Sequence, residues 1–235
     1  MHRIRLLLTF ACVAAALAAS CGPASRDHHD HGPIAGGSAQ GLVASTGRLL
    51  VEVDHVADRT PSAGALALLR QRLLDRGNWS AVDVVLDGKL PRLDRAEPWR
   101  LGDLLALEAR HRSVATGEGE QAIYVVYVEG QGEPELGHWP LGWAYGPNSI
   151  AVFVDQFEDA ATLSHGDPEP WVLVHETGHL LGLVGLGAPQ QTFHEDLTRM
   201  GHCAEAACVM RRAADARHTD FGPRCREDLR AIGGR

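Results

Sequence analysis

The chain has 235 residues, 45% hydrophobic and 22% charged, so it is long enough to bury a sizeable core and its composition is that of an ordinary globular protein. Its net charge is -8, and Lys89 is its only lysine. The body of the chain has no basic cluster, which argues against nucleic acid as a partner.

The first 20 residues have the features of a secretory signal peptide: two arginines, then an apolar run from Leu6 to Ala19, then small residues. The run is too short for a comfortable membrane span. The residues Ala-Ala-Ser before Cys21 resemble a bacterial lipoprotein cleavage box, in which the cysteine becomes the lipidated N-terminus. Ordinary secretion, with Cys21 as a free thiol, is the alternative. Both predict an extracytoplasmic location, and the lipoprotein resemblance implies a lipid anchor in a bacterial cell envelope.

Residues 21–46 are rich in glycine, alanine and serine and lack hydrophobic periodicity, which predicts a flexible tether. From residue 47 to 235, segments rich in β-branched residues alternate with segments that have apolar residues at helical spacing. This alternation predicts an α/β fold with crossover connections and a mostly parallel sheet, its helices on both faces. The predicted strands are Leu49–Val53, Ala81–Leu86 and Gln121–Val128, and the predicted helices are Ala65–Leu74 and Leu101–His111.

The segment His138–Asp155 interrupts this alternation with two short strand-like stretches on either side of a turn of glycine, proline and asparagine. The second stretch, Ser149–Val154, is predicted to be the strand directly before the next helix. The first, Gly142–Tyr145, is a candidate antiparallel edge strand. An edge strand can pair with the backbone of a bound peptide, and it can equally be part of an ordinary hairpin, so both alternatives stay open.

The helix predicted over Trp171–Leu183, WVLVHETGHLLGL, carries two histidines four residues apart, His175 and His179. This spacing places both imidazoles on one face of an α-helix, where they can share a zinc ion. Glu176 lies next to the first histidine, and its carboxylate can hydrogen-bond a metal-bound water without coordinating the metal. The motif is the H-E-x-x-H of hydrolytic zinc sites. Its apolar surroundings predict a core helix, in which buried histidines need partners.

A hydrolytic zinc site needs a third protein ligand and an open position for water or substrate. Gly182 extends the motif to H-E-x-x-H-x-x-G, and a glycine there lets the chain leave the helix and turn back toward the metal. At this point the sequence resembles the metzincin family of zinc endopeptidases, whose pattern continues with x-x-H. In this chain Gly185 occupies the position of that histidine.

The segment from His202 to Met210, H-C-x-x-x-x-C-x-M, resembles the part of archaemetzincins that joins the third zinc-binding histidine to the methionine of the Met-turn. The resemblance implies an insertion from about residue 183 to 201, His202 as the third ligand and Met210 as hydrophobic support. It also implies an α+β zincin fold whose active-site helix precedes a small irregular C-terminal subdomain, here from about residue 183. From the residues alone, His194 is a competing third ligand and Asp196 a weaker one.

Three cysteines lie in the C-terminal part, namely Cys203, Cys208 and Cys225. Archaemetzincins, which the chain resembles, have four such cysteines that hold a second, structural zinc, whereas this chain has Asp228 at the last place. A second zinc held by three thiolates and a carboxylate is therefore one expectation. Outside the cytoplasm a disulfide competes with it, and we favour a disulfide between Cys203 and Cys208, which would brace the Met-turn.

These features predict a zinc-dependent endopeptidase that acts on a peptide or protein, with Glu176 as the general base for a metal-activated water. One alternative is a surface lipoprotein that keeps the zinc site for binding without turnover. The presence of Glu176 argues against it, because a structural zinc has a closed shell of four ligands and needs no general base. A zinc amidase acting on cell-wall peptides is a further alternative that the motif does not exclude.

Overall fold

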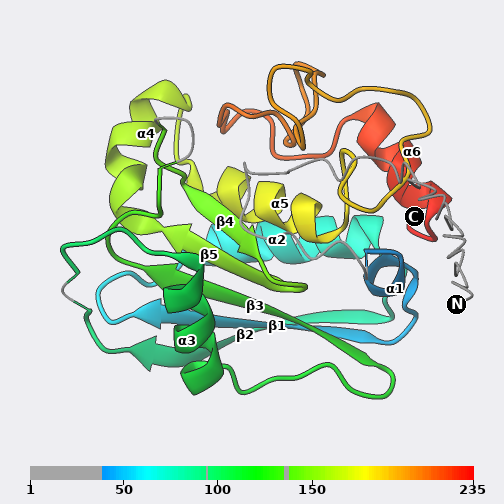
Figure 1. The fold of residues 1–235 in the computed structure, drawn as a ribbon. Helices are drawn as coiled ribbons and strands as arrows, with labels where there is room; N and C mark the ends of the chain where they lie inside the picture. The colour runs from blue at the N-terminus through cyan, green and yellow to red at the C-terminus, as the bar shows by residue number, and fades with distance from the viewer. Residues whose placement is uncertain (1–38, 94, 135–137) are drawn as a thin grey trace, which may run out of the picture.

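The computed structural model describes residues 39–93, 95–134 and 138–235. The predicted signal peptide, the lipidation site Cys21 and most of the predicted tether therefore lie outside the described residues. No helix within the described ranges is long and apolar enough to cross a membrane. In chain order the elements are α1 (Ala39–Ala44), β1 (Arg48–Val56), α2 (Ala63–Arg76), β2 (Ala81–Leu90), α3 (Leu101–His111), β3 (Glu120–Val128), β4 (Gly142–Tyr145), β5 (Ser149–Phe153), a 3-10 turn (Val154–Gln156), α4 (Phe157–Leu163), α5 (Glu169–Leu180) and α6 (Pro223–Ala231) (Figure 1).

The five strands form one sheet in the order β2-β1-β3-β5-β4. β1 is parallel to β2 and β3, and β3 is parallel to β5, whereas β4 at the edge is antiparallel to β5. Helix α2 joins β1 to β2 and α3 joins β2 to β3, which are the crossover connections that parallel neighbours require. The predicted fold class is confirmed: the sheet is mixed and mostly parallel, with helices and one antiparallel edge strand.

Helices cover both faces of the sheet, with α2 and α5 on one face and α3 on the other (Figure 1). Successive side chains of β3 enter different cores, because neighbours on a strand point to opposite faces. Val125 and Tyr127 pack in the core that contains α2 and α5, and Tyr124 and Val126 pack in the core that contains α3. This double burial explains why β3 is apolar along most of its length.

Three short helices are absent from the sequence-based prediction. One of them, α4, lies between β5 and α5, so the expectation that the strand leads directly into the motif helix is wrong. Its 7 residues give too few turns for apolar periodicity to stand out, and Gln156 before it makes no side-chain cap. Helix α6 is mostly polar, and its buried residues are confined to Cys225, Asp228 and Leu229, which share one face.

The third short helix, α1, changes the boundary of the folded domain. The tether was expected to continue to residue 46, whereas Leu42 and Val43 are only 2% and 0% exposed and belong to the main core. The carbonyl of Val43 also accepts a hydrogen bond from the backbone N–H of Asn78 at 3.1 Å. The segment was misjudged because two apolar residues among small ones give no periodic pattern.

We therefore expect Leu42→Ala to lower the free energy of unfolding by about 2–5 kcal/mol, the cost of removing a fully buried leucine. The matched control is Leu86→Ala on β2, where the leucine is 45% exposed and the cost should stay near 0.5 kcal/mol. Denaturant unfolding of both variants measures the difference. Equal, small effects would mean that α1 does not belong to the folded core.

Candidate metal centre

Helix α5 is held rigidly in the core. Every residue from Glu169 to Leu180 except Pro170 is buried. The carboxylate of Glu169 in its first turn accepts hydrogen bonds from the Tyr127 hydroxyl at 2.9 Å and from the Ser62 backbone N–H at 3.0 Å. These bonds fasten the start of α5 to β3 and to the N-cap of α2. The motif side chains therefore project from a helix that has little freedom to move.

The helix is closed by a glycine, as the extended motif predicts. Gly182 has a φ of 77°, in the left-handed region that favours glycine. Its N–H bonds to the carbonyl of His179 at 2.9 Å, and the N–H of Leu183 bonds to the carbonyl of Gly178 at 3.1 Å. The chain thus leaves the helix sharply after the second motif histidine.

Three buried histidines lie close together, two from α5 and one from a later loop. His175, His179 and His202 are 3%, 1% and 7% exposed, and one ligand nitrogen of each lies within 4.8 Å of the others. The alternative third ligands lie elsewhere. His194 belongs to a second cluster with two cysteines, and Asp196 accepts hydrogen bonds from the backbone and hydroxyl of its own loop.

The three histidines fit a zinc ion by type, number and spacing. Nδ1 of His175 lies 2.8 Å from the carbonyl oxygen of Val209, which can only accept, so Nδ1 carries the proton and Nε2 keeps its lone pair. The Nε2 atoms of His175 and His179 are 3.1 Å apart. With Zn–N distances of about 2.0–2.1 Å, two nitrogens of a tetrahedral site are about 3.4 Å apart. Three such ligands leave a fourth position for water or substrate.

The turn that contains Met210 makes three contacts that hold the histidine group in place. Met210 is fully buried against Gly178 of α5, where an added Cβ would overlap the methionine sulfur. The backbone carbonyl of Met210 accepts a hydrogen bond of 2.7 Å from the N–H of Cys203, the neighbour of His202. The carbonyl of Val209 orients the first motif histidine. One short turn thus packs on the motif helix and contacts both parts of the histidine group.

Glu176 is 5% exposed and is oriented by the edge strand. Its Oε2 accepts a hydrogen bond of 2.9 Å from the backbone N–H of Ala144 in β4. The strand approaches this closely because residue 142 is glycine: an added Cβ would lie 2.9 Å from Cγ of Glu176 and 2.8 Å from Cγ1 of Val172. The edge strand therefore fixes the carboxylate that the motif assigns as the general base.

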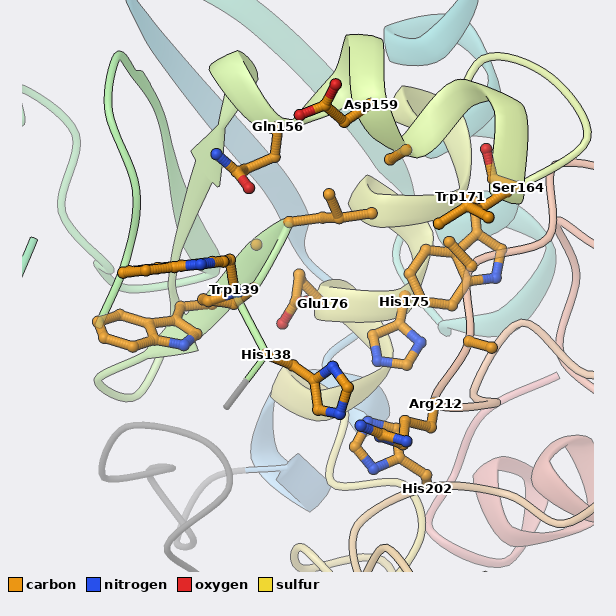
Figure 2. A pocket seen from close by; sticks show the side chains of 18 of the residues that line it. His138, Trp139, Gln156, Asp159, Ser164, Trp171, His175, Glu176, His202 and Arg212 are labelled. Atoms are coloured by element: carbon orange, nitrogen blue, oxygen red, sulfur yellow. The ribbon is translucent and has the colours of Figure 1, made fainter. Parts of the chain in front are cut away.

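A cleft of about 500 Å³ opens beside these residues. His175, Glu176 and His202 line it, together with the segment that leads into β4, helix α4 and the loop after the Met-turn. Figure 2 shows Trp139 on one side of Glu176, and Trp171 with Ser164 on the other. The candidate metal ligands and the carboxylate therefore face the same space, which a peptide could enter.

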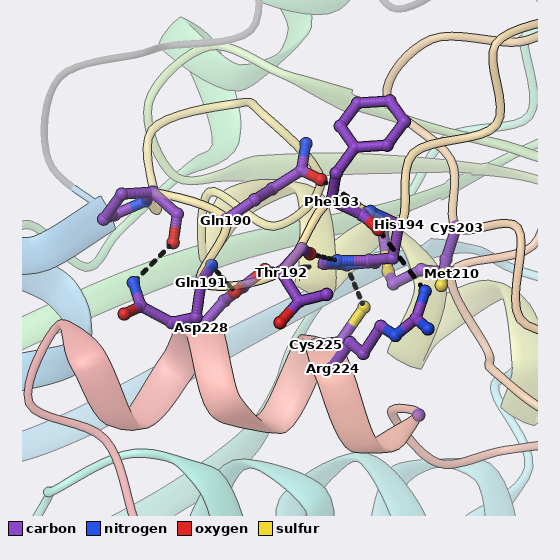
Figure 3. A network of polar contacts seen from close by, with 12 residues as sticks. Gln190, Gln191, Thr192, Phe193, His194, Cys203, Met210, Arg224, Cys225 and Asp228 are labelled. Carbon is purple, nitrogen blue, oxygen red and sulfur yellow. Dashed lines mark hydrogen bonds and ion pairs between the residues drawn. The ribbon is translucent and has the colours of Figure 1, made fainter.

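The three cysteines and His194 are buried and form a second cluster, of which Figure 3 shows His194, Cys203 and Cys225. The Sγ atoms of Cys208 and Cys225 are 3.6 Å apart, and Nε2 of His194 lies 3.4 Å from Sγ of Cys225. Ligand atoms of His194, Cys203 and Cys225 all lie within 4.8 Å of one another. Cysteine sulfur and histidine nitrogen are the donors of structural zinc sites, so this group also suits zinc.

Backbone N–H groups point at the sulfurs of this cluster. Gly222 and Met210 donate to Sγ of Cys208 at 3.0 Å and 3.4 Å. The neighbouring Cys203 and Cys225 thiols, together with these backbone donors, lower the pKa of Cys208 to about 3. The pKa of Cys203 is raised to about 12, chiefly by its contact with Cys208. These contacts favour the thiolate form of Cys208, which is the form of cysteine that binds a metal ion.

The thiols of Cys203, Cys208 and Cys225 are free in this structure, and the disulfide expected between Cys203 and Cys208 stays a prediction. The sulfurs converge together with His194 and accept backbone N–H bonds, and this geometry places no two of them as an isolated pair. Asp228 was the expected fourth ligand. It is fully buried, but its Oδ1 accepts the N–H of Gln191 at 2.7 Å and its Oδ2 lies 3.5 Å from Nε2 of His194. The carboxylate of Asp228 therefore lies beside the same nitrogen of His194 that faces Cys225.

Four residues that shape the candidate site were not predicted from the sequence, namely Gly142, Ala144, Gly178 and Val209. Ala144 and Val209 act through backbone atoms, which any residue possesses. The two glycines act by lacking a side chain. The single detectable signal was Gly178, because glycine inside a helix costs up to about 1 kcal/mol relative to alanine and therefore indicates a packing requirement.

No protein-family model matches the chain, and no curated protein matches it in sequence. Among solved structures it is similar to archaemetzincin from Methanopyrus kandleri, with a TM-score of 0.51, 18% identity, and coverage of 79% of this chain and 95% of that chain. It is also similar to a zinc-dependent peptidase from Methanocorpusculum labreanum, with a TM-score of 0.48, 16% identity, and coverage of 76% and 99%. At this level of identity the first likeness shows a shared fold.

We expect Gly178→Ala to lower the free energy of unfolding by about 1–3 kcal/mol, because the new methyl group must displace Met210. Gly102→Ala is the control, since nothing lies within 4 Å of an added Cβ at that position of α3. This control should be neutral, or stabilising by up to about 1 kcal/mol. Chemical unfolding measures both variants, and a harmless Gly178→Ala would contradict the tight packing of the Met-turn on α5.

Proposed function

We propose that this chain is a zinc-dependent endopeptidase in which His175, His179 and His202 hold the catalytic zinc and Glu176 is the general base. The observation that carries the proposal is the convergence of three buried imidazoles within 4.8 Å beside a carboxylate that faces a cleft. The fold shared with an archaemetzincin supports it, since that fold supports a zinc peptidase at the level of the family. Fold alone does not determine activity, so the site residues carry the argument.

When bound, zinc supplies a Lewis acid that polarises the scissile carbonyl and lowers the pKa of water from 15.7 toward about 7. The Glu176 carboxylate takes a proton from the attacking water and passes it to the leaving amine. Its hydrogen bond from Ala144 fixes the direction in which the carboxylate faces the cleft. His175 contributes a fixed tautomer, because the carbonyl of Val209 retains the proton on Nδ1.

The substrate backbone would bind along β4. Within the described residues β4 pairs with β5 alone, so its other side is a sheet edge, and the segment before it lines the cleft. An extended peptide can add to such an edge through main-chain hydrogen bonds. This alignment brings the peptide backbone past the Glu176 carboxylate, which the same strand holds. An endopeptidase requires this kind of sequence-independent backbone recognition.

We further propose that Cys203, Cys208, Cys225 and His194 bind a second, structural zinc. Three thiolate sulfurs and one imidazole nitrogen would give the four ligands that such a site needs, and the backbone N–H bonds to sulfur stabilise thiolates. Nδ1 of His194 lies 2.8 Å from the carbonyl oxygen of Thr192, so Nε2 is the nitrogen that would coordinate the metal. Oδ2 of Asp228 lies 3.5 Å from that same nitrogen, a separation that two ligands of one zinc can have, so Asp228 is the alternative fourth ligand. The role of this zinc would be to tie the inserted segment and α6 to the Met-turn.

Two other functions are alternatives to the peptidase, and the predicted location of the chain is a separate proposal. A binding module without turnover would use the same zinc site, and a zinc amidase acting on cell-wall peptides would use the same chemistry on a different substrate. The oriented carboxylate of Glu176 favours a hydrolase over a binding module. A lipid anchor in a bacterial cell envelope remains a prediction from the N-terminal residues, which lie outside the described part of the chain.

The central test of the peptidase proposal is Glu176→Gln. The amide cannot accept the water proton, so we expect peptide hydrolysis to fall by at least about 100-fold while zinc content and melting temperature stay unchanged. Hydrolysis of a quenched fluorescent peptide library, with zinc measured by mass spectrometry, gives both readouts. Full activity in this variant would end the assignment of Glu176.

The two metal sites can be separated by cobalt substitution, because thiolate ligands give Co²⁺ intense near-ultraviolet absorption and imidazole ligands do not. We expect two ions per wild-type chain. His202→Ala should lose the catalytic ion and keep the thiolate band, whereas His194→Ala should weaken metal binding at the thiolate site and leave the catalytic ion in place. If His194→Ala emptied the histidine site instead, the third catalytic ligand would be misassigned.

A further inference from the structure

Two arginines border the cleft on the side of His202. Arg199 and Arg212 both line it, and Figure 2 shows Arg212 next to His202. They come from separate loops, one before His202 and one after the Met-turn. Two cations beside a hydrolytic site are notable in a chain whose net charge is -8, because the surface as a whole repels acidic ligands.

Neither charge is used to hold the fold together. Within the described residues, no carboxylate forms an ion pair with the guanidinium of Arg199 or Arg212. Other arginines of the chain do pair, as Arg112 does with Glu108 at 2.7 Å and Arg217 does with Asp215 at 2.7 Å. The two cleft arginines are therefore available to a ligand.

The acidic groups nearest to them in sequence are already engaged. Asp196 accepts hydrogen bonds from the backbone N–H and the hydroxyl of Thr198, at 2.9 Å and 2.7 Å. Asp215 holds the guanidinium of Arg217 through both of its carboxylate oxygens. These two carboxylates are thus satisfied without the two arginines that line the cleft.

Both arginines lie in loops whose backbones are held by hydrogen bonds. Arg199 lies in a turn in which its N–H bonds to the carbonyl of Asp196 at 3.0 Å, and Asp196 in turn bonds to the carbonyl of His202 at 2.8 Å. The loop of Arg212 is tied at one end by Arg211 to Cys208 at 3.1 Å. A preorganised backbone lowers the entropy that a ligand must overcome on binding.

The other end of the Arg212 loop is tied to the far wall of the cleft. The N–H of Ala216 bonds to the carbonyl of Ser164 at 2.8 Å, directly after α4. The acidic lining residue Asp159 of α4 lies across the cleft from Arg212 (Figure 2). The cleft is therefore cationic on the side of His202 and anionic on the side of α4, which would align a peptide in one direction.

We propose that Arg199 and Arg212 form a carboxylate-binding subsite, so that the site acts on peptides with an acidic group close to the cleaved bond. The guanidinium fork matches a carboxylate in geometry and can donate two parallel hydrogen bonds to it. An aspartate or glutamate side chain and a C-terminal carboxylate offer the same chemistry. The inference rests on the proposed peptidase function and defines its substrate class.

Binding is tested first, in the zinc-loaded Glu176→Gln variant of the full chain, which holds peptides without cleaving them. The probes are fluorescent peptides of one sequence, with glutamate or glutamine at each position in turn and with a C-terminal acid or amide. We expect a carboxylate near the centre to tighten binding about tenfold, and the acid and amide termini to reveal which source of carboxylate is used. Anisotropy titrations give the dissociation constants.

The arginines are then replaced in the same background. Arg199→Gln and Arg212→Gln together should reduce the preference for the acidic peptide to less than about twofold, with little change for the uncharged peptide. Arg110→Gln, an exposed arginine of α3, is the matched control and should leave the preference intact. A preference that survives the double substitution, or an absence of preference in the parent protein, overturns the proposal.

Cleavage by the otherwise wild-type protein separates this proposal from the proposed function. Faster hydrolysis of the acidic peptide, lost in the double arginine variant, supports both. Equal hydrolysis of acidic and uncharged peptides overturns the subsite and leaves the peptidase assignment in place. Selective binding of acidic peptides without cleavage of any peptide supports the subsite and overturns the peptidase.

Discussion

The hydrogen bond between Nδ1 of His175 and the carbonyl of Val209 is the contact on which the candidate metal centre depends. A helix can present two imidazoles on one face, but it cannot choose their tautomers or supply a third ligand. The turn around Val209 sets the tautomer of His175 directly, because its carbonyl accepts the proton on Nδ1. The bond between the carbonyl of Met210 and the N–H of Cys203 fixes the backbone beside His202. The motif helix is therefore incomplete without a segment that lies outside it in the sequence.

The long elements of the fold could be predicted from the sequence, because their hydrophobic patterns extend over several repeats. The predicted α3 agrees with the structure at both ends, and the class of sheet follows from the alternation of strands and helices. The short helices α1, α4 and α6 could not be predicted in this way. Their burial depends on what packs against them, as for Leu42 and Val43, and a single sequence does not contain that information.

The residues of the candidate site also differ in whether a local sequence pattern predicts them. His175, Glu176 and His179 follow from local spacing, and His202 follows from the resemblance of the segment that ends at Met210. The arrangement of the cysteine cluster could not be predicted, because one sequence does not show which side chains meet the sulfurs in the fold. The sequence places His194 in an unpatterned loop, and only the fold brings it to Cys225, at 3.4 Å.

The inserted segment 183–201 has ends that are set by other parts of the molecule. The cap at Gly182 fixes where it starts, and the bond between Cys203 and Met210 fixes where it finishes. Lengthening a loop with fixed ends costs little free energy, since closure entropy grows only with the logarithm of length. A change in the length of this segment would therefore leave both of its ends in place. Because Arg199 of this segment lines the cleft, such a change would alter the shape of the cleft while the backbone at His179 and Cys203 keeps its position.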